Sequence, residues 1–192
     1  TGDFTGDGKT DILWRNTQTT AVGLWEMDGA TLKSATAFGA IPAEWVAVGA
    51  GDFTGDGKAD ILWRNTATSE TGLWEMDGTT LVRAGLTSVQ GGADWQIGAL
   101  GDLDGDGKTD LVWRNKTTQQ VGLWQMDGFQ VSNYRVLDAI PNEWTMEGTG
   151  DYDGDGRDDV LWRNSNDDTI AAWRSFDQNG AIGIEPRIIA NA

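Results

Sequence analysis

The sequence has no cysteine and no histidine among its 192 residues. The absence of cysteine excludes disulfides, zinc–thiolate sites and thiol nucleophiles, and the absence of histidine removes the side chain most often used as a general base. Basic residues are also scarce, since 14 Lys and Arg face 30 Asp and Glu, which gives a net charge of −16. Nucleic acids and anionic membrane surfaces both require clustered positive charge, so neither is an expected partner.

Long apolar runs are missing as well, because no stretch approaches the ~20 residues of a membrane span. We therefore expect no membrane insertion. No signal peptide is recognisable, and the chain opens inside a motif at Thr1-Gly2-Asp3. The sequence is expected to be a mature or excised segment of a longer protein.

What the chain does contain is a repeat. The phrase "GDFTGDGKTDILWRN" starts at Gly2, and close copies start at Gly51, Gly101 and Gly150, so the spacing is 49, 50 and 49 residues. The motif "GLWEMDG" and the eleven tryptophans keep the same step. We interpret the chain, residues 1–192, as one repeat domain with repeats at about 1–44, 45–94, 95–143 and 144–192.

Each repeat is predicted to form four short strands, which in the second repeat lie at about 45–53, 59–64, 70–76 and 80–86. The strand at 59–64 is apolar on both faces, because Ile61 and Trp63 point one way and Leu62 the other. Such a strand suits a sheet between neighbouring sheets. The predicted fold is all-β, a β-propeller built from four four-stranded blades of ~49 residues. A β-solenoid or a string of small β-domains is the alternative.

The two ends leave the closure of the ring open. The first repeat lacks part of its inner strand, and the fourth ends at "RIIANA" where an outer strand is expected. Four blades that close alone, part of a larger ring, and a ring completed by a second chain all agree with the sequence.

The acidic loop follows the pattern D-x-[T/D]-G-D-G-x-x-D, which is typical of a site for a hard cation. Calcium takes six to eight oxygen ligands in flexible geometry. We expect side-chain oxygens from positions 1, 3, 5 and 9, and a backbone carbonyl from position 7, with one calcium ion per repeat. The expected ligands are Asp3, Thr5, Asp7, Lys9 and Asp11; Asp52, Thr54, Asp56, Lys58 and Asp60; Asp102, Asp104, Asp106, Lys108 and Asp110; and Asp151, Asp153, Asp155, Arg157 and Asp159.

Other readings of this loop explain less. An Asx-type turn accounts for one or two aspartates but not for four acids within nine residues. An EF-hand needs a glutamate at position 12, where this chain has tryptophan, and magnesium prefers a rigid octahedral shell with several waters. Because Thr5 and Thr54 replace a carboxylate, we predict weaker binding in the first two loops.

The loop and the apolar strand after it resemble the FG-GAP and VCBS repeats of integrin-type β-propellers and of many secreted bacterial proteins. The resemblance covers all four repeats and is specific at positions 1, 5 and 9. It implies a calcium loop that joins the inner two strands of each blade. It also implies a secreted or cell-surface, bacterial origin and, in some relatives, lectin activity at repeated sites between blades. Thr5 and Thr54 depart from the Asp or Asn usual at position 3.

The tryptophans and arginines also recur in register. Trp14, Trp63, Trp113 and Trp162 are predicted to pack between blades, and Trp45, Trp95 and Trp144 to begin inner strands. Arg15, Arg64, Arg114 and Arg163 are expected to pair with loop or turn aspartates. An aromatic face beside a carboxylate suits sugar binding. The candidate ligand-binding residues are Trp25, Glu26 and Asp28; Trp74, Glu75 and Asp77; and Trp124, Gln125 and Asp127.

No catalytic constellation is apparent, and we do not expect an enzyme. A repeated acid usually does a repeated structural job, whereas an active site is a single arrangement. The predicted function is a noncatalytic, calcium-stabilised module that binds glycans or mediates adhesion outside the cell. The alternatives are a scaffold that binds an extracellular protein or a second copy of itself, and an accessory domain of a larger secreted enzyme.

Overall fold

The computed structural model describes residues 1–190, and every regular element in that range is a β-strand. The first sheet contains β1 (Ile12–Arg15), β2 (Ala21–Asp28) and β3 (Thr31–Ala40). The second contains β4 (Trp45–Gly51), β5 (Asp60–Asn65), β6 (Thr71–Asp77) and β7 (Thr80–Leu86). The third contains β8 (Trp95–Gly101), β9 (Asp110–Asn115), β10 (Gln120–Asp127) and β11 (Gln130–Ala139). The fourth contains β12 (Trp144–Gly150), β13 (Asp159–Asn164), β14 (Ile170–Asp177) and β15 (Ile182–Ala190).

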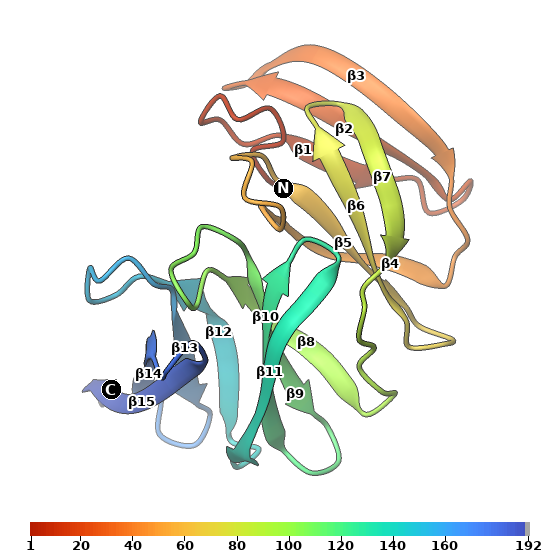
Figure 1. Cartoon of the computed structure of the whole chain (residues 1–192). Helices are drawn as coiled ribbons and strands as arrows, with labels where there is room; N and C mark the ends of the chain where they lie inside the picture. Colours follow the sequence, from red (N-terminus) through yellow and green to blue (C-terminus); the bar gives the residue numbers. More distant parts are fainter. Residues whose placement is uncertain (191–192) are drawn as a thin grey trace. The chain divides into compact units, whose positions relative to one another are not determined.

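All four sheets are antiparallel meanders, with strands paired in chain order (Figure 1). The first sheet has three strands, and a bridge between Gly2 and Asp11 stands where the other sheets have their inner strand. This agrees with the incomplete inner strand expected from the sequence. The prediction of an all-β fold made of blade-like sheets is confirmed. Within residues 1–190 no helix is long and apolar enough to cross a membrane.

Burial is greatest in the two middle strands of each four-stranded sheet and lower in the first and last strands. Residues Asp60 to Trp63 of β5 are all buried, whereas nearly all of β7 is exposed. A strand that is apolar on both faces needs a neighbour on each face, and the sequence of β5 predicts such a buried strand. The observed strands of the second repeat agree with those predicted to within two residues at each end.

The "RN" that ends each second strand has a role that the sequence did not reveal. The side chain of Asn115 accepts hydrogen bonds from the backbone N–H groups of Thr117 and Thr118, at 2.9 and 2.8 Å. Gln119 then takes a left-handed conformation with φ of 62°. Asn16 and Asn65 make the same pair of bonds, so this asparagine shapes the hairpin turn in at least three repeats.

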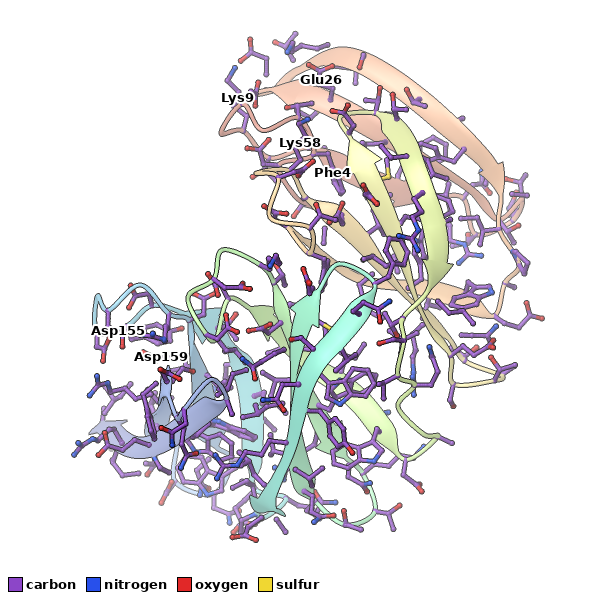
Figure 2. The ribbon with its side chains drawn as sticks, in the orientation of Figure 1. Phe4, Lys9, Glu26, Lys58, Asp155 and Asp159 are labelled. Atoms are coloured by element: carbon purple, nitrogen blue, oxygen red, sulfur yellow. The ribbon has the colours of Figure 1, made fainter. Side chains whose placement is uncertain are left out.

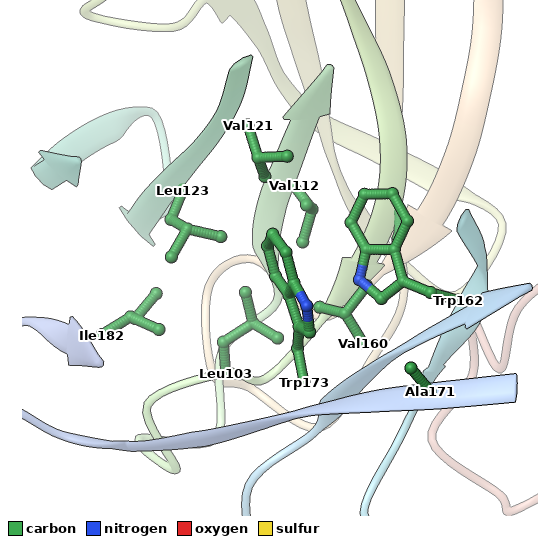
Figure 3. Packing of buried hydrophobic residues seen from close by; sticks show 10 residues of the cluster. Leu103, Val112, Val121, Leu123, Val160, Trp162, Ala171, Trp173 and Ile182 are labelled. Atoms are coloured by element: carbon green, nitrogen blue, oxygen red, sulfur yellow. The ribbon is translucent and has the colours of Figure 1, made fainter. Parts of the chain in front are cut away.

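The chain divides into two compact units, Thr1–Gln90 and Gly91–Ala192, each of which holds two sheets. In the first unit, Val22 and Leu24 of the first sheet, with Phe4 of its acidic loop, pack against Ile61 and Met76 of the second sheet. The second unit has the same kind of core between its sheets, shown in Figure 3, with Leu103, Val112, Leu123, Val160 and Trp173. In each unit two sheets therefore bury their facing sides against each other, as neighbouring propeller blades do.

Candidate functional site

The acidic loop joins the first two strands of each four-stranded sheet. In the third sheet it runs from Gly101, the end of β8, to Asp110, the start of β9. Gly105 and Gly107 have φ of 76° and 85°, in the region that disfavours side chains, so glycine at positions 4 and 6 lets the backbone curl around the first aspartate. The other three loops have the same pair of left-handed glycines.

The aspartate at position 1 organises this curl. Asp102 accepts N–H bonds from Gly105 and Asp106 at one oxygen and from Gly107 at the other, at 2.8, 3.1 and 2.8 Å. Asp3, Asp52 and Asp151 make the same three bonds. An Asx-type turn is therefore present. The aspartate at position 1 makes most of its bonds, and the aspartate at position 5 adds one more by accepting from the position 7 N–H in all four loops.

The acids at positions 1, 3 and 5 converge in the last two loops. Asp102, Asp104 and Asp106 each place an oxygen within 4.8 Å of the others, and so do Asp151, Asp153 and Asp155. Burial, followed by the like charges of Asp104 and Asp106, raises the pKa of Asp102 although three N–H groups bond to it. Three carboxylates held this close repel one another, and a hard cation that takes oxygen ligands fits such a donor set.

Protein cations approach some of these acids. Lys108 contacts Asp106 at 3.1 Å, and Arg174 contacts Asp153 directly and Asp155 at 3.8 Å. Asp104 has a different neighbour, since it accepts a hydrogen bond from the Gln125 amide at 2.7 Å. The neighbour of the Asp104 carboxylate is therefore a neutral amide and not a cation.

The first two loops offer fewer charges. Thr5 places its hydroxyl 3.5 Å from Asp3, and Thr54 lies at the same distance from Asp52. Two carboxylates, at positions 1 and 5, remain in each loop. Weaker calcium binding in the first two loops than in the last two thus stays a prediction, and the missing carboxylate at position 3 is its structural reason.

The position 9 aspartates lie apart from the converging group. Asp110 is fully buried, and its two oxygens accept N–H bonds from Leu103 at 3.0 Å and Met126 at 2.9 Å. Desolvation is the main cause that raises the pKa of Asp110 to about 8. The equivalents Asp11, Asp60 and Asp159 are also buried, and they tie the loop to β2, β6 and β14 in the same way. Asp159 and the exposed Asp155 of the same loop are labelled in Figure 2. Their role as cation ligands rests on the sequence pattern alone.

The position 7 side chains act next to the loop. Lys9, Lys58 and Lys108 form ion pairs with Asp28, Asp77 and Asp127 at 3.1, 2.6 and 3.2 Å. In the fourth loop Arg157 donates from Nε to the carbonyl of Asp104, 3.1 Å away. These contacts involve only the side chains, so the ligand role of the position 7 carbonyls stays a prediction.

The structure separates the three residue types proposed as a sugar site. Trp124 and Gln125 are consecutive in β10, so their side chains lie on opposite faces of the sheet. Gln125 forms a hydrogen bond with Asp104 of the acidic loop, whereas Glu26 bonds to Lys33 and Ser34 on the neighbouring strand β3. The third members, Asp28, Asp77 and Asp127, are the ion-pair partners named above. The motif therefore does not form one cluster of an aromatic ring and two acids.

The tryptophans of that motif pack on the tryptophans of the neighbouring strand. The ring centroids of Trp63 and Trp74 lie 5.0 Å apart, those of Trp113 and Trp124 4.6 Å, and those of Trp162 and Trp173 4.8 Å. Trp63 and Trp162 belong to the cores between sheets, which confirms the predicted packing role for these two. Trp25 is the most open member of its series, with 39% of its surface exposed.

Two apolar pockets lie at equivalent places in the two units. The pocket in the first unit has a volume of about 320 Å³ and is lined by Ile41, Pro42, Trp45, Trp63, Trp74 and the end of β7. The pocket in the second unit has about 220 Å³ and is lined by Ile140, Pro141, Trp144, Trp162, Trp173 and part of β15. The "IPAEW" and "IPNEW" segments were the sequence signal for these pockets, but their pairing with distant tryptophans depends on tertiary structure.

A more polar pocket of about 390 Å³ opens between the third and fourth sheets. Two aromatic side chains line it, Trp144 and Trp162. Arg114 and Lys116 supply positive charge, and Gln96, Gln119, Asn142 and Thr145 supply amide and hydroxyl groups. The guanidinium carbon of Arg114 lies 5.4 Å from the ring centre of Trp162, in the range of a cation–π contact. No repeated motif in the sequence indicates this pocket, because its lining combines residues from two sheets and the linker between them.

The repeated arginines correct one expectation. Arg163 pairs with the turn residue Asp168, as predicted. Arg15 instead donates to the carbonyls of Ile41, Pro42 and Trp45, and Arg114 donates to carbonyls and to Gln119. The prediction of aspartate partners is therefore wrong for Arg15 and Arg114, because their side chains reach the linker before the next sheet rather than an acidic turn.

Comparisons with known proteins agree with the repeat. The FG-GAP-like repeat matches residues 3–63, and the FG-GAP repeat matches residues 95–122. No curated protein matches the sequence. Among solved structures, a rhamnogalacturonan lyase PL11 of Bacillus licheniformis is 12% identical with a TM-score of 0.43, over 88% of this chain and 42% of that chain. The chain thus spans less than half the length of that structure. Both matched segments carry the acidic loop and the strand after it, so these two parts of the chain are FG-GAP-type repeats, as the sequence predicted.

Proposed function

We propose that this chain is a noncatalytic binding module that calcium stabilises and that binds carbohydrate in the polar pocket between the third and fourth sheets. One observation carries the carbohydrate part of the proposal. That pocket combines the partly exposed indole of Trp144 with amide, hydroxyl and guanidinium groups, while the buried Trp162 supports Arg114 from below. Sugars require this combination, because their C–H faces stack on aromatic rings while their hydroxyls need hydrogen-bond partners.

Calcium is the cation that best suits the acidic loops. In the second unit, Asp102, Asp104 and Asp106 would hold one ion and Asp151, Asp153 and Asp155 another. A bound ion would neutralise carboxylates that otherwise repel one another, and it would pin the first two strands of each sheet. Extracellular calcium is abundant enough to fill sites of modest affinity, so we place the protein outside the cell.

Chelation tests the calcium part. A ligand that binds only the folded state adds about 2.7 kcal/mol when its concentration is 100 times Kd. We therefore expect the melting temperature to fall in EGTA and to recover with calcium but not with an equal concentration of magnesium. Calorimetry is expected to resolve tighter sites in the last two loops. A melting temperature that EGTA leaves unchanged contradicts a structural role for calcium.

The sugar part is tested with a glycan array and then by tryptophan fluorescence with the sugars that bind. Trp144→Ala is expected to abolish the fluorescence change. Trp45→Ala is the matched control, because Trp45 begins the equivalent strand β4 in the first unit and lines only the apolar pocket there among the pockets described. Circular dichroism verifies that both variants fold. Loss of binding in both variants, or in neither, would argue against this pocket.

The apolar pockets favour a second candidate, a protein partner. Their linings are almost entirely apolar side chains, which suit a partner's aliphatic or aromatic residue better than a sugar. The outer strands add exposed apolar side chains, including Val82 on β7, Tyr134 on β11 and Ile188 on β15. Light scattering tests self-association, and a dimer that Ile188→Ser dissociates would favour this candidate.

A further inference from the structure

The polar pocket has an uneven charge. The chain as a whole carries −16, yet the charged side chains that line this pocket are the two cations, Arg114 and Lys116. Among residues 1–190 neither cation has a carboxylate within 4.0 Å. Glu147 accepts a hydrogen bond from Thr145 at 2.9 Å, so this nearby acid is bound to a hydroxyl and not to either cation.

Arg114 is incompletely satisfied. Its Nη2 donates to neutral acceptors, which are the carbonyls of Ile140 and Pro141 and the side chain of Gln119. Its Nη1 is buried and has no hydrogen-bond partner within the described part of the chain. Burial lowers the pKa of Arg114, which is the effect of removing a charge from water without an anion beside it. A buried donor without an acceptor is costly, and a charged donor most of all.

The first unit provides a comparison within the same chain. Arg15 occupies the position equivalent to Arg114, but its Nη1 donates to the carbonyl of Trp45. Thr17 stands where Lys116 stands in the third repeat, and Ala43 stands where Asn142 precedes the fourth sheet. The cationic pair and its amide neighbour therefore occur together at the junction of the third and fourth sheets and not at that of the first and second.

We propose that the pocket between the third and fourth sheets binds an acidic sugar, whose carboxylate lies between Arg114 and Lys116 while its ring stacks on a tryptophan. An ionised carboxylate supplies the acceptor that Arg114 Nη1 lacks and forms charge-assisted bonds with both cations. Gln96 and Asn142 are placed to meet ring hydroxyls. This inference rests on the proposed carbohydrate function and names its ligand class, a uronic acid unit within a glycan.

The test measures calorimetric affinity of the whole chain, at constant calcium, for uronate tetrasaccharides of the gluco, galacto and manno series. Each is compared with the neutral tetrasaccharide that has CH2OH in place of the carboxylate. We expect at least one uronate to bind about 10- to 100-fold more tightly than its neutral counterpart, since a hydrogen bond to a charged group contributes about 1.5–3 kcal/mol. Inorganic phosphate is expected to compete weakly.

Two variants localise the effect. Lys116→Gln changes an exposed side chain and does not endanger folding, and Arg114→Gln removes the buried donor. Both are expected to lose most of the preference for uronates, whereas the control Arg15→Gln keeps it. Equal binding of acidic and neutral sugars would overturn the acidic ligand and leave the carbohydrate function standing. Binding of neither kind would overturn both, and phosphate binding as tightly as the uronates would identify a simple anion site and overturn the sugar.

Discussion

Neutralising Asp104 should raise the stability of the ion-free protein and reduce the stabilisation that calcium adds. Asp104, Asp106 and Asp102 each place an oxygen within 4.8 Å of the other two. At that distance two unit charges repel by about 0.9 kcal/mol at the dielectric constant of water, which is a lower bound here because Asp102 and Asp104 are partly buried. Asp104→Asn removes two of the three repulsive pairs, so the ion-free protein should gain about 2 kcal/mol.

The hydrogen bonds of Asp104 allow this substitution. Its Oδ1 accepts from the backbone N–H of Asp106 at 3.1 Å, which an asparagine oxygen can also do. Its Oδ2 accepts from the Gln125 amide, and that amide can turn to accept from the new NH2 group. In calcium the variant has one charged ligand fewer, so the stabilisation by the ion should shrink.

The assay is thermal and urea unfolding of both proteins in EGTA and in calcium. For a protein of this size about 1 kcal/mol corresponds to about 2–4 °C, so the variant should melt several degrees higher than the parent in EGTA. Its rise on adding calcium should be smaller than the parent's. Asp138→Asn, an exposed acid on β11, controls for the change in net charge. Thr54→Asp is the reverse change and should give the reverse result.

One outcome would refute this reasoning. If Asp104→Asn lowers the melting temperature in EGTA as much as in calcium, then Asp104 acts through charge-assisted turn hydrogen bonds that an asparagine oxygen forms more weakly. The cluster would then be a structural turn and not a cation site.

Two further predictions concern the buried polar groups. In EGTA the free energy of unfolding should fall as pH rises from about 4 to 8. The reason is that the pKa of Asp110 is about 8 and that of Asp60 about 6 in the folded protein, well above the ~3.9 of an unfolded aspartate. Urea titrations across this range measure the free energy, Asp110→Asn should flatten its slope, and a free energy that rises with pH would contradict the prediction. Asn115→Ala should lower the free energy of unfolding by about 1–2 kcal/mol, because two turn N–H groups lose their acceptor. The control Asn133→Ala, at an exposed position, should lower it little. Equal decreases in urea unfolding would show that the turn does not depend on Asn115.

The pH prediction holds because carboxyls with lowered pKa titrate elsewhere. N–H bonds to Asp151, with that from Gly156 the strongest, lower its pKa, so it changes charge below this window. Calcium should also weaken the slope for Asp110, because Asp104 and Asp106 contribute to the elevation of its pKa and the ion would neutralise them.

The sequence predicted those features of the fold that depend on local pattern. Alternation and turn residues placed the strands of the second repeat, and the incomplete inner strand of the first repeat appeared as a single bridge at Gly2. The same alternation also implied that Trp124 and Gln125 face opposite sides, so the separation of the proposed sugar site was readable from the sequence.

Other features depended on contacts between sheets. Asp110 bonds to Met126, a residue of the third strand that is 16 positions away, and the spacing of loop residues carries no record of this. Arg114 donates to the carbonyl of Ile140, 26 positions away in the linker. Local sequence shows only the acids of nearby turns, so it predicts an aspartate partner instead. The pockets likewise combine a linker, a strand start and the next sheet.

Repetition itself separates structure from function in this chain. The residues that recur in every repeat, such as the first aspartate of the loop and the tryptophan before "RN", make the same contacts in each unit and hold the sheets together. A ligand that binds once needs a departure from the repeat. Lys116, Asn142 and Thr145 replace Thr17, Ala43 and Val46 at equivalent places, and all three line the polar pocket beside the unsatisfied nitrogen of Arg114. Substituting these three residues into the first unit should therefore not transfer uronate binding. Arg15 Nη1 is engaged by the carbonyl of Trp45, and the first sheet, as the structure describes it, has a single bridge in place of the strand that supplies Gln96 to the polar pocket.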